Sequence, residues 1–119
     1  MRIYLEDIRS YCLSKDFTEE GFPFDENTLV FKVGGKMYAL IDVEKSESIN
    51  LKCNPERAEE LRENNEGIIP GYHMSKKHWN TVSLDGIVDQ KLVFELIDHS
   101  YQLVYASLTK KVKHELENR

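Results

Sequence analysis

The sequence lacks the short motifs through which common enzymes hold phosphates, nucleophiles or zinc. Its 119 residues contain no GxGxxG, GxxxxGK[ST], GxSxG or HExxH pattern. The only two cysteines, Cys12 and Cys53, are far apart and lack the spacing of a metal or redox pair, so both are expected to be reduced and buried. We therefore expect no enzymatic activity, no cofactor and no metal site.

Long hydrophobic runs are also missing. The N-terminal residues 1–7 reach acidic side chains before any apolar run forms, which argues against a signal peptide, and no segment approaches membrane-spanning length. We expect a cytoplasmic protein without a membrane partner. With 40% hydrophobic and 31% charged residues, the chain is typical of a single globular domain, spanning residues 1–119, and a monomer is favoured.

The chain has fewer basic than acidic residues. The chain has 16 Lys and Arg against 21 Asp and Glu, which gives a formal net charge of −5. A net negative charge disfavours long-range attraction to nucleic acid or to an anionic membrane. Binding to either would therefore need a local basic face.

Two strands joined by a tight turn are the clearest predicted element. Residues 29–33 and 36–43 flank Gly34-Gly35, a pair that supplies the positive φ angles of a two-residue hairpin turn. A third strand is predicted at 48–53, because apolar and polar residues alternate there and Lys52 falls on the outward face. The three segments predict an antiparallel meander.

Helices are predicted on both sides of this meander. Apolar residues three and four apart predict a helix over residues 2–15, and Asn54-Pro55 is typical of the start of another that runs to residue 64 or 65. A helix of about 25 residues, beginning after Asp89, is expected to break near His99-Ser100. Between the first helix and the hairpin, we expect a loop whose aromatic side chains close the edge of the core: Phe17, Phe22 and Phe24.

Residues 70–82 differ from the rest of this acidic chain. They contain the only Trp, two of the four His and a lysine pair, without a carboxylate, and residues 78–84 alternate as a strand. Cations for phosphates and flat rings for bases are typical of a nucleic-acid surface. The same residues also fit a simpler role, in which Trp79 anchors the core and Lys76 and Lys77 are solvated.

Several segments, in order along nearly the whole chain, resemble the MmcQ/YjbR family: Phe22-Pro23-Phe24, 29–37, 51–58, 70–74, 77–82, Ser100-Tyr101 and Leu103-Val104. The resemblance implies a CyaY-like (frataxin-like) α+β fold, an antiparallel sheet with helices packed on one face. It also implies a bacterial-type cytoplasmic protein. Members are described as predicted DNA-binding proteins with a double-wing motif, and the family supplies no established catalytic residues.

The leading hypothesis is a non-enzymatic DNA-binding module whose two wings are the hairpin around Gly34-Gly35 and the 71–80 segment. The predicted nucleic-acid-binding residues are Lys36, Lys52, His73, Lys76, Lys77, His78, Trp79 and Asn80. The alternative is a small-molecule or protein-interaction module that uses Tyr72, His73, His78 and Trp79. The frataxin-like fold also raises iron binding by the acidic helix, through Glu56, Glu59, Glu60 and Glu63, on fold analogy alone.

Overall fold

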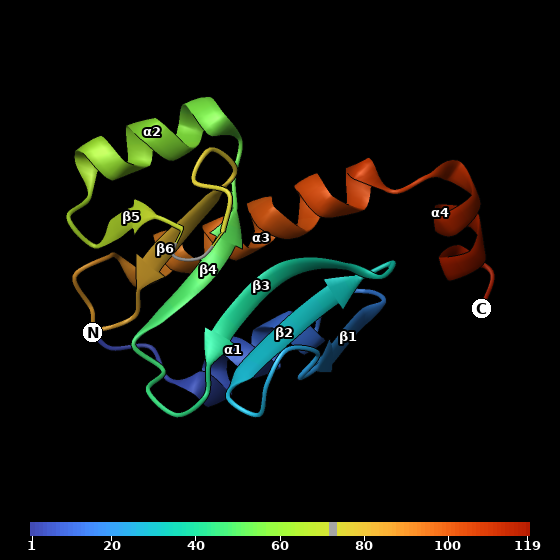
Figure 1. Ribbon diagram of the computed structural model, residues 1–119, viewed down its shortest axis with the longest axis horizontal. Helices are drawn as coiled ribbons and strands as arrows, with labels where there is room; N and C mark the ends of the chain where they lie inside the picture. The colour runs from blue at the N-terminus through green and yellow to red at the C-terminus, as the bar shows by residue number, and fades with distance from the viewer. Residues whose placement is uncertain (72–73) are drawn as a thin grey trace.

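A six-stranded antiparallel sheet carries the fold, and helices cover one of its faces (Figure 1). The computed structural model describes residues 1–71 and 74–119. The strands are β1 (Thr18–Gly21), β2 (Thr28–Val33), β3 (Lys36–Asp42), β4 (Ser48–Lys52), β5 (Ile68–Pro70) and β6 (Trp79–Ser83), in the spatial order β1-β2-β3-β4-β6-β5. The helices are α1 (Leu5–Leu13), α2 (Pro55–Asn64), α3 (Gln90–Ser107) and α4 (Lys110–Glu117). The predicted α+β architecture is confirmed.

Local sequence signals fix the predicted hairpin and the start of α2. Gly34 and Gly35 adopt φ angles of 59° and 83°, as the turn requires. A Cβ on Gly34 would also lie 2.6 Å from a methyl of Leu108, so a side chain at this position would require Leu108 to move. The Asn54 side chain accepts hydrogen bonds from the first backbone N–H groups of α2, which confirms it as the N-cap.

Two predictions about the fold are wrong, and one strand was not predicted. The segment after α1 contains strand β1, which pairs with β2, and Phe22 and Phe24 are 50% and 64% exposed, whereas Phe17 packs against the core as predicted. Strand β5 was not predicted because it has only three residues. Helix α3 continues through His99-Ser100 and ends at Ser107, since Thr109 caps a separate helix α4 by accepting a hydrogen bond from the Val112 N–H.

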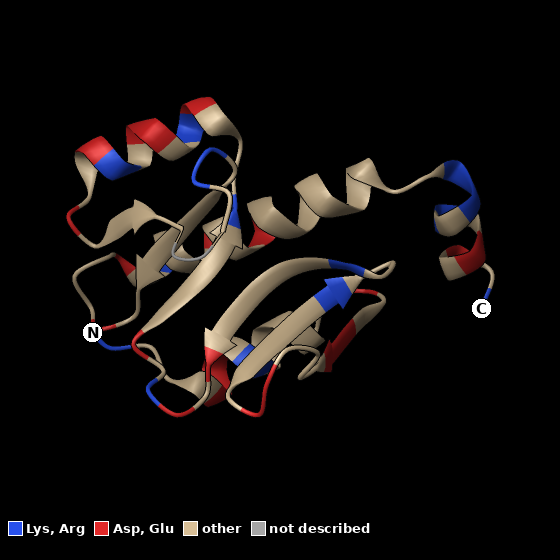
Figure 2. Ribbon diagram, in the orientation of Figure 1, with Lys and Arg blue, Asp and Glu red and all other residues tan. Residues whose placement is uncertain are grey.

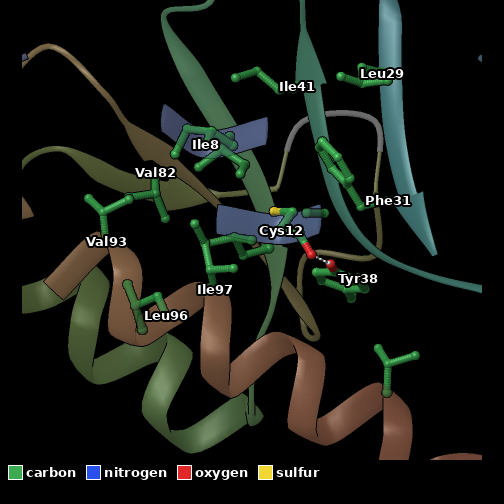
Figure 3. Close-up of a cluster of buried hydrophobic side chains, with 14 of the residues drawn as sticks. Ile8, Cys12, Leu29, Phe31, Tyr38, Ile41, Val82, Val93, Leu96 and Ile97 are labelled. Carbon is green, nitrogen blue, oxygen red and sulfur yellow. Dashed lines mark hydrogen bonds between the residues drawn. The ribbon is translucent and has the colours of Figure 1, made fainter. Parts of the chain in front are cut away.

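The core lies between the sheet and the pair α1 and α3 (Figure 3). Cys12 from α1 and Ile97 from α3 meet Phe31 and Ile41 of the sheet, and all four are almost completely buried. Helix α2 packs beside this layer, where its backbone carbonyl at Ala58 accepts a hydrogen bond from the buried Asn80 amide. Within the described residues, no helix is long and apolar enough to cross a membrane.

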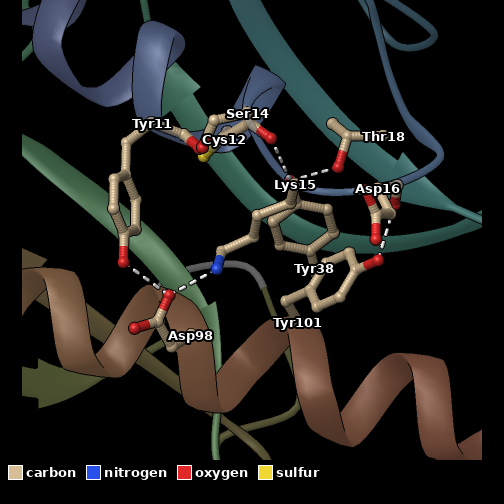
Figure 4. A network of polar contacts seen from close by, with 9 residues as sticks. All are labelled: Tyr11, Cys12, Ser14, Lys15, Asp16, Thr18, Tyr38, Asp98 and Tyr101. Atoms are coloured by element: carbon tan, nitrogen blue, oxygen red, sulfur yellow. Dashed lines mark hydrogen bonds and ion pairs between the residues drawn. The ribbon is translucent and has the colours of Figure 1, made fainter.

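Polar contacts join α1 to α3 at the margin of the core (Figure 4). Asp98 accepts hydrogen bonds from the Tyr11 hydroxyl, at 2.7 Å, and from the Lys15 ammonium. The bond to Asp98 favours the protonated phenol and raises the pKa of Tyr11 to about 12. In the same region the Tyr38 hydroxyl donates to the Cys12 carbonyl at 3.2 Å, which joins β3 to α1.

Ser100 bridges strands β3 and β4 beyond the point where their direct pairing ends. The pairing of β3 with β4 stops at Ala39 and Leu51, and the two strands diverge beyond this point (Figure 1). The buried Ser100 hydroxyl donates to the Tyr38 carbonyl at 2.5 Å and accepts from the Lys52 N–H at 2.9 Å. One hydroxyl from α3 therefore satisfies a backbone group of each strand across the gap.

Replacing this hydroxyl should destabilise the protein. Ser100→Ala leaves a partly buried N–H and a buried carbonyl without their partner, and we expect a loss of about 2 kcal/mol in the free energy of unfolding. Urea denaturation followed by circular dichroism would measure it. Ser107→Ala is the matched control, because Ser107 is exposed and donates only to Val104 of its own helix; an equal loss in both variants would contradict this role for Ser100.

Candidate nucleic-acid interface

Most of the predicted DNA-contacting lysines lie at one end of the sheet. The register pairs Val33 with Lys36 across the hairpin and Lys52 with Trp79 across β4 and β6. Because Ala39 pairs with Leu51, the hairpin turn and the end of β4 point in the same direction. We call this region the basic end and define it by Lys36, Lys52, Lys76, Lys77 and His78; all are exposed except Lys52, which is half-buried.

The turn at residues 75–78 is fastened to its neighbours through its backbone. The Trp79 N–H donates to the Ser75 carbonyl at 2.9 Å, and the His78 carbonyl accepts from the Cys53 N–H at 2.8 Å. On the other side, the Arg62 guanidinium of α2 donates to the Lys76 carbonyl. These bonds use main-chain atoms of the turn and leave its exposed side chains directed outward.

Two residues predicted to contact DNA are buried instead. Trp79 is 8% exposed and packs with Val30 and Leu40 on the face of the sheet opposite α1 and α3. Asn80 is 2% exposed, and its carbonyl oxygen accepts a hydrogen bond from Arg62 at 2.6 Å. Neither side chain can contact a nucleic acid in this arrangement. Asn80 instead holds Arg62, whose guanidinium also donates to the Lys76 carbonyl of the 75–78 turn. The simpler role considered for Trp79, anchoring packed side chains, fits its burial.

The structure describes only part of the group predicted for the alternative function, Tyr72, His73, His78 and Trp79. His73 and Tyr72 lie outside the described residues, so the predictions that use them have no structural counterpart here. Of the group proposed for the alternative function, His78 is exposed and Trp79 is buried.

The structure adds cations that sequence reasoning did not assign to this surface. Leu108 and Val112 pack against Gly34, which brings α4 and its exposed Lys110 and Lys111 to the hairpin. The Lys110-Lys111 pair is visible in the sequence. Its position could not be predicted, because the break in the long helix was expected near His99-Ser100, and α3 instead continues to Ser107.

Carboxylates gather at the opposite end of the sheet (Figure 2). The β2–β3 register pairs Thr28 with Asp42, and Ser48 pairs with Ser83, so the loops at these strand ends lie together. We call this region the acidic end; its carboxylates are Asp25, Glu26, Asp42, Glu44, Glu47 and Asp85. Within a net charge of −5, lysines therefore cluster at one end of the sheet and carboxylates at the other, while the acidic helix α2 lies beside the 75–78 turn (Figure 2).

No cluster of side chains suited to holding a metal ion is assembled in the described residues. Residues 1–71 and 74–119 contain no set of three His, Cys, Asp or Glu side chains that could hold a metal ion, and this includes the acidic face of α2. Cys12 and Cys53 are both buried, and burial raises the pKa of Cys12 to about 12. A thiol with a raised pKa is a poor nucleophile at neutral pH.

The fold and this surface define a small α+β protein with a one-sided sheet and clustered lysines. The model of the YjbR family matches residues 13–103. The uncharacterized protein YjbR of Escherichia coli is 33% identical over 99 residues, which cover 82% of this chain and 84% of YjbR. The uncharacterized Escherichia coli protein YbdF is 35% identical over 107 residues, covering 89% of this chain and 88% of YbdF.

A solved structure agrees with this match. The crystal structure of the Deinococcus radiodurans protein DR2400, of family domain DUF419, superposes with a TM-score of 0.91 at 46% identity and covers 98% of this chain and 89% of its own. The chain belongs to the YjbR family.

One histidine near the basic end should make stability depend on pH. The ring Nε2 of His99 accepts a hydrogen bond from the Asn54 N–H at 3.2 Å, so the ring is neutral. Burial and the nearby Arg57 lower the pKa of His99 below its usual 6.5. The unfolded chain therefore binds a proton more readily, and the stabilising contribution, complete above about pH 6.5, is lost as pH falls through the lower folded pKa.

Urea denaturation at several pH values tests this linkage. Between pH 7.5 and 5, the wild type should lose more stability than the variant His99→Gln, which has no titrating ring at this position. Parallel curves for the two proteins would show that His99 does not couple folding to pH.

Proposed function

We propose that this protein is a non-enzymatic DNA-binding module that contacts the duplex with its basic end. The observation that carries the proposal is the segregation of charge: Lys36, Lys52, Lys76 and Lys77 lie at one end of the sheet, and the acidic end is at the other. A phosphate backbone would be attracted to the first and repelled by the second. This uneven distribution of charge would orient the protein on DNA despite its net negative charge.

The separation of β3 from β4 supports a two-pronged contact. The hairpin carries Lys36 on one side of the gap, and the 75–78 turn carries Lys76 and Lys77 on the other. Lys52 ends β4 between them, with its N–H bonded to Ser100. These two projections correspond to the two wings of the proposed double-wing motif.

The contacts would position the protein without selecting a sequence. Lysine is a flexible point charge that suits phosphates, whereas sequence is read by side chains that reach base edges. The buried Asn80 and Trp79 are unsuited to that task. We therefore expect modest affinity and a strong dependence on salt.

Reversing the charge of the 75–78 turn tests the proposal. In fluorescence anisotropy with labelled duplex DNA, the wild type should bind with a slope of about −3 to −4 in log K against log salt, from about four phosphate contacts. The double variant Lys76→Glu/Lys77→Glu should lose binding even at low salt, and its circular dichroism spectrum should be unchanged, because both side chains are exposed.

The double variant Lys45→Glu/Lys91→Glu is the matched control. It changes the net charge by the same amount at two exposed lysines outside the basic end, and it should bind DNA nearly as the wild type does. Equal losses in the two double variants would mean that only net charge matters. Undiminished binding by Lys76→Glu/Lys77→Glu would refute the assigned surface.

A further inference from the structure

The face of the sheet that α1 and α3 leave uncovered contains a groove that the proposed DNA surface does not use. Figure 1 views the sheet from this side. The groove has a volume of about 700 Å³ and extends from the loop before β2 to β5 and β6. Ligand sites for small molecules typically occupy about 300 to 1,000 Å³. We call this cavity the open groove.

The floor of the open groove is apolar. Leu40 forms its centre, where it packs with Val30 and Trp79, and Met37 and Met74 lie against this cluster. At the rim, Phe24 and Ile69 are 64% and 51% exposed. Methionine side chains adapt to varied ligand shapes, and large apolar side chains left exposed together mark binding surfaces.

The charged groups that line the open groove are mostly carboxylates. Among the described residues, the lining includes Asp25, Asp42 and Glu47 and one cation, Lys45. The Asp25 carboxylate is held in place by the N–H groups of Asn27 and Thr28, at 2.9 and 2.7 Å, and these bonds lower its pKa.

The Asp42 carboxylate is fixed in a similar way. It accepts hydrogen bonds from the N–H groups of Glu44 and Lys45, at 2.9 and 3.1 Å. Local turns therefore fix two negative charges beside an apolar floor.

We infer that the open groove binds a small organic cation with a flat apolar body, of the aryl-alkylamine class. The apolar body would lie on Leu40, Met37 and Met74, and the ammonium would face Asp42 and Glu47. The same carboxylates repel phosphates, so this site is separate from the basic end. Loss of DNA binding in Lys76→Glu/Lys77→Glu would leave ligand binding in the open groove unaffected. Loss of ligand binding in the groove would likewise leave DNA binding unaffected.

The three methionines make the inference directly testable. The full-length protein, isotopically labelled at the methionine methyl groups, is titrated with tryptamine and with its neutral analogue tryptophol, and methyl NMR spectra are recorded. Tryptamine should shift the Met37 and Met74 signals saturably. Met1, which is 93% exposed and does not line the groove, should stay unchanged as the internal control.

Charge variants test the preference for a cation. Asp42→Asn/Glu47→Gln keeps the shape and the hydrogen-bond acceptors, and it should weaken tryptamine about five- to tenfold with little effect on tryptophol. Lys45→Gln removes the one lysine among the described residues that line the groove and should strengthen tryptamine binding. Opposite shifts in affinity from these two variants would support the inference.

Four results would overturn the inference. The first is the absence of Met37 and Met74 shifts in the titration with tryptamine, and the second is equal affinity for tryptamine and tryptophol. The third is a dependence of these signals on protein concentration without ligand, which would assign the groove to a second copy of the chain. The fourth is a lysine-bearing amphipathic peptide that shifts both signals where tryptamine does not, which would assign the groove to a protein partner.

Discussion

The fold depends on one buried hydroxyl at the point where the sheet divides. Ser100 of α3 joins the Tyr38 carbonyl of β3 to the Lys52 N–H of β4 where direct pairing between the strands has ended. Without this bridge, a buried carbonyl and a partly buried N–H would lack partners, at a cost of about 2 kcal/mol. With it, the hairpin and the end of β4 can separate while the core beneath them stays closed. The two projections proposed to contact DNA are a consequence of this local arrangement.

The distribution of charge follows from the order of the strands. Every pair of neighbouring strands is antiparallel, so turns alternate between the two ends of the sheet. The hairpin at Gly34-Gly35 and the 75–78 turn fall at one end with their lysines, and the loops that contain Asp25, Asp42 and Glu47 fall at the other. A protein with a net charge of −5 can therefore present a basic surface. Between these ends, the uncovered face of the sheet provides the apolar floor of the open groove.

Features with strong local signals could be predicted from the sequence. The hairpin followed from its glycine pair, the start of α2 from Asn54, and the burial of Cys12 from the lack of metal or redox spacing between the two cysteines. Strand β1 could not be predicted, because its residues are polar and it is held by backbone pairing with β2. Trp79 and Asn80 were assigned to the binding surface from their residue types. Their burial depends on Leu40 and Arg62, which lie far away in the sequence.

Mapping duplex DNA onto the protein by amide NMR tests the central claim most directly. In a titration at low salt, the account predicts that the backbone signals of Lys36, Lys52 and residues 75–78 shift together. It also predicts that the signals of Asp25, Asp42 and Glu47 do not move, and that the shifts disappear as salt is added. Shifts centred on the acidic end, or no shifts at any salt concentration, would contradict the assignment of DNA binding to the basic end.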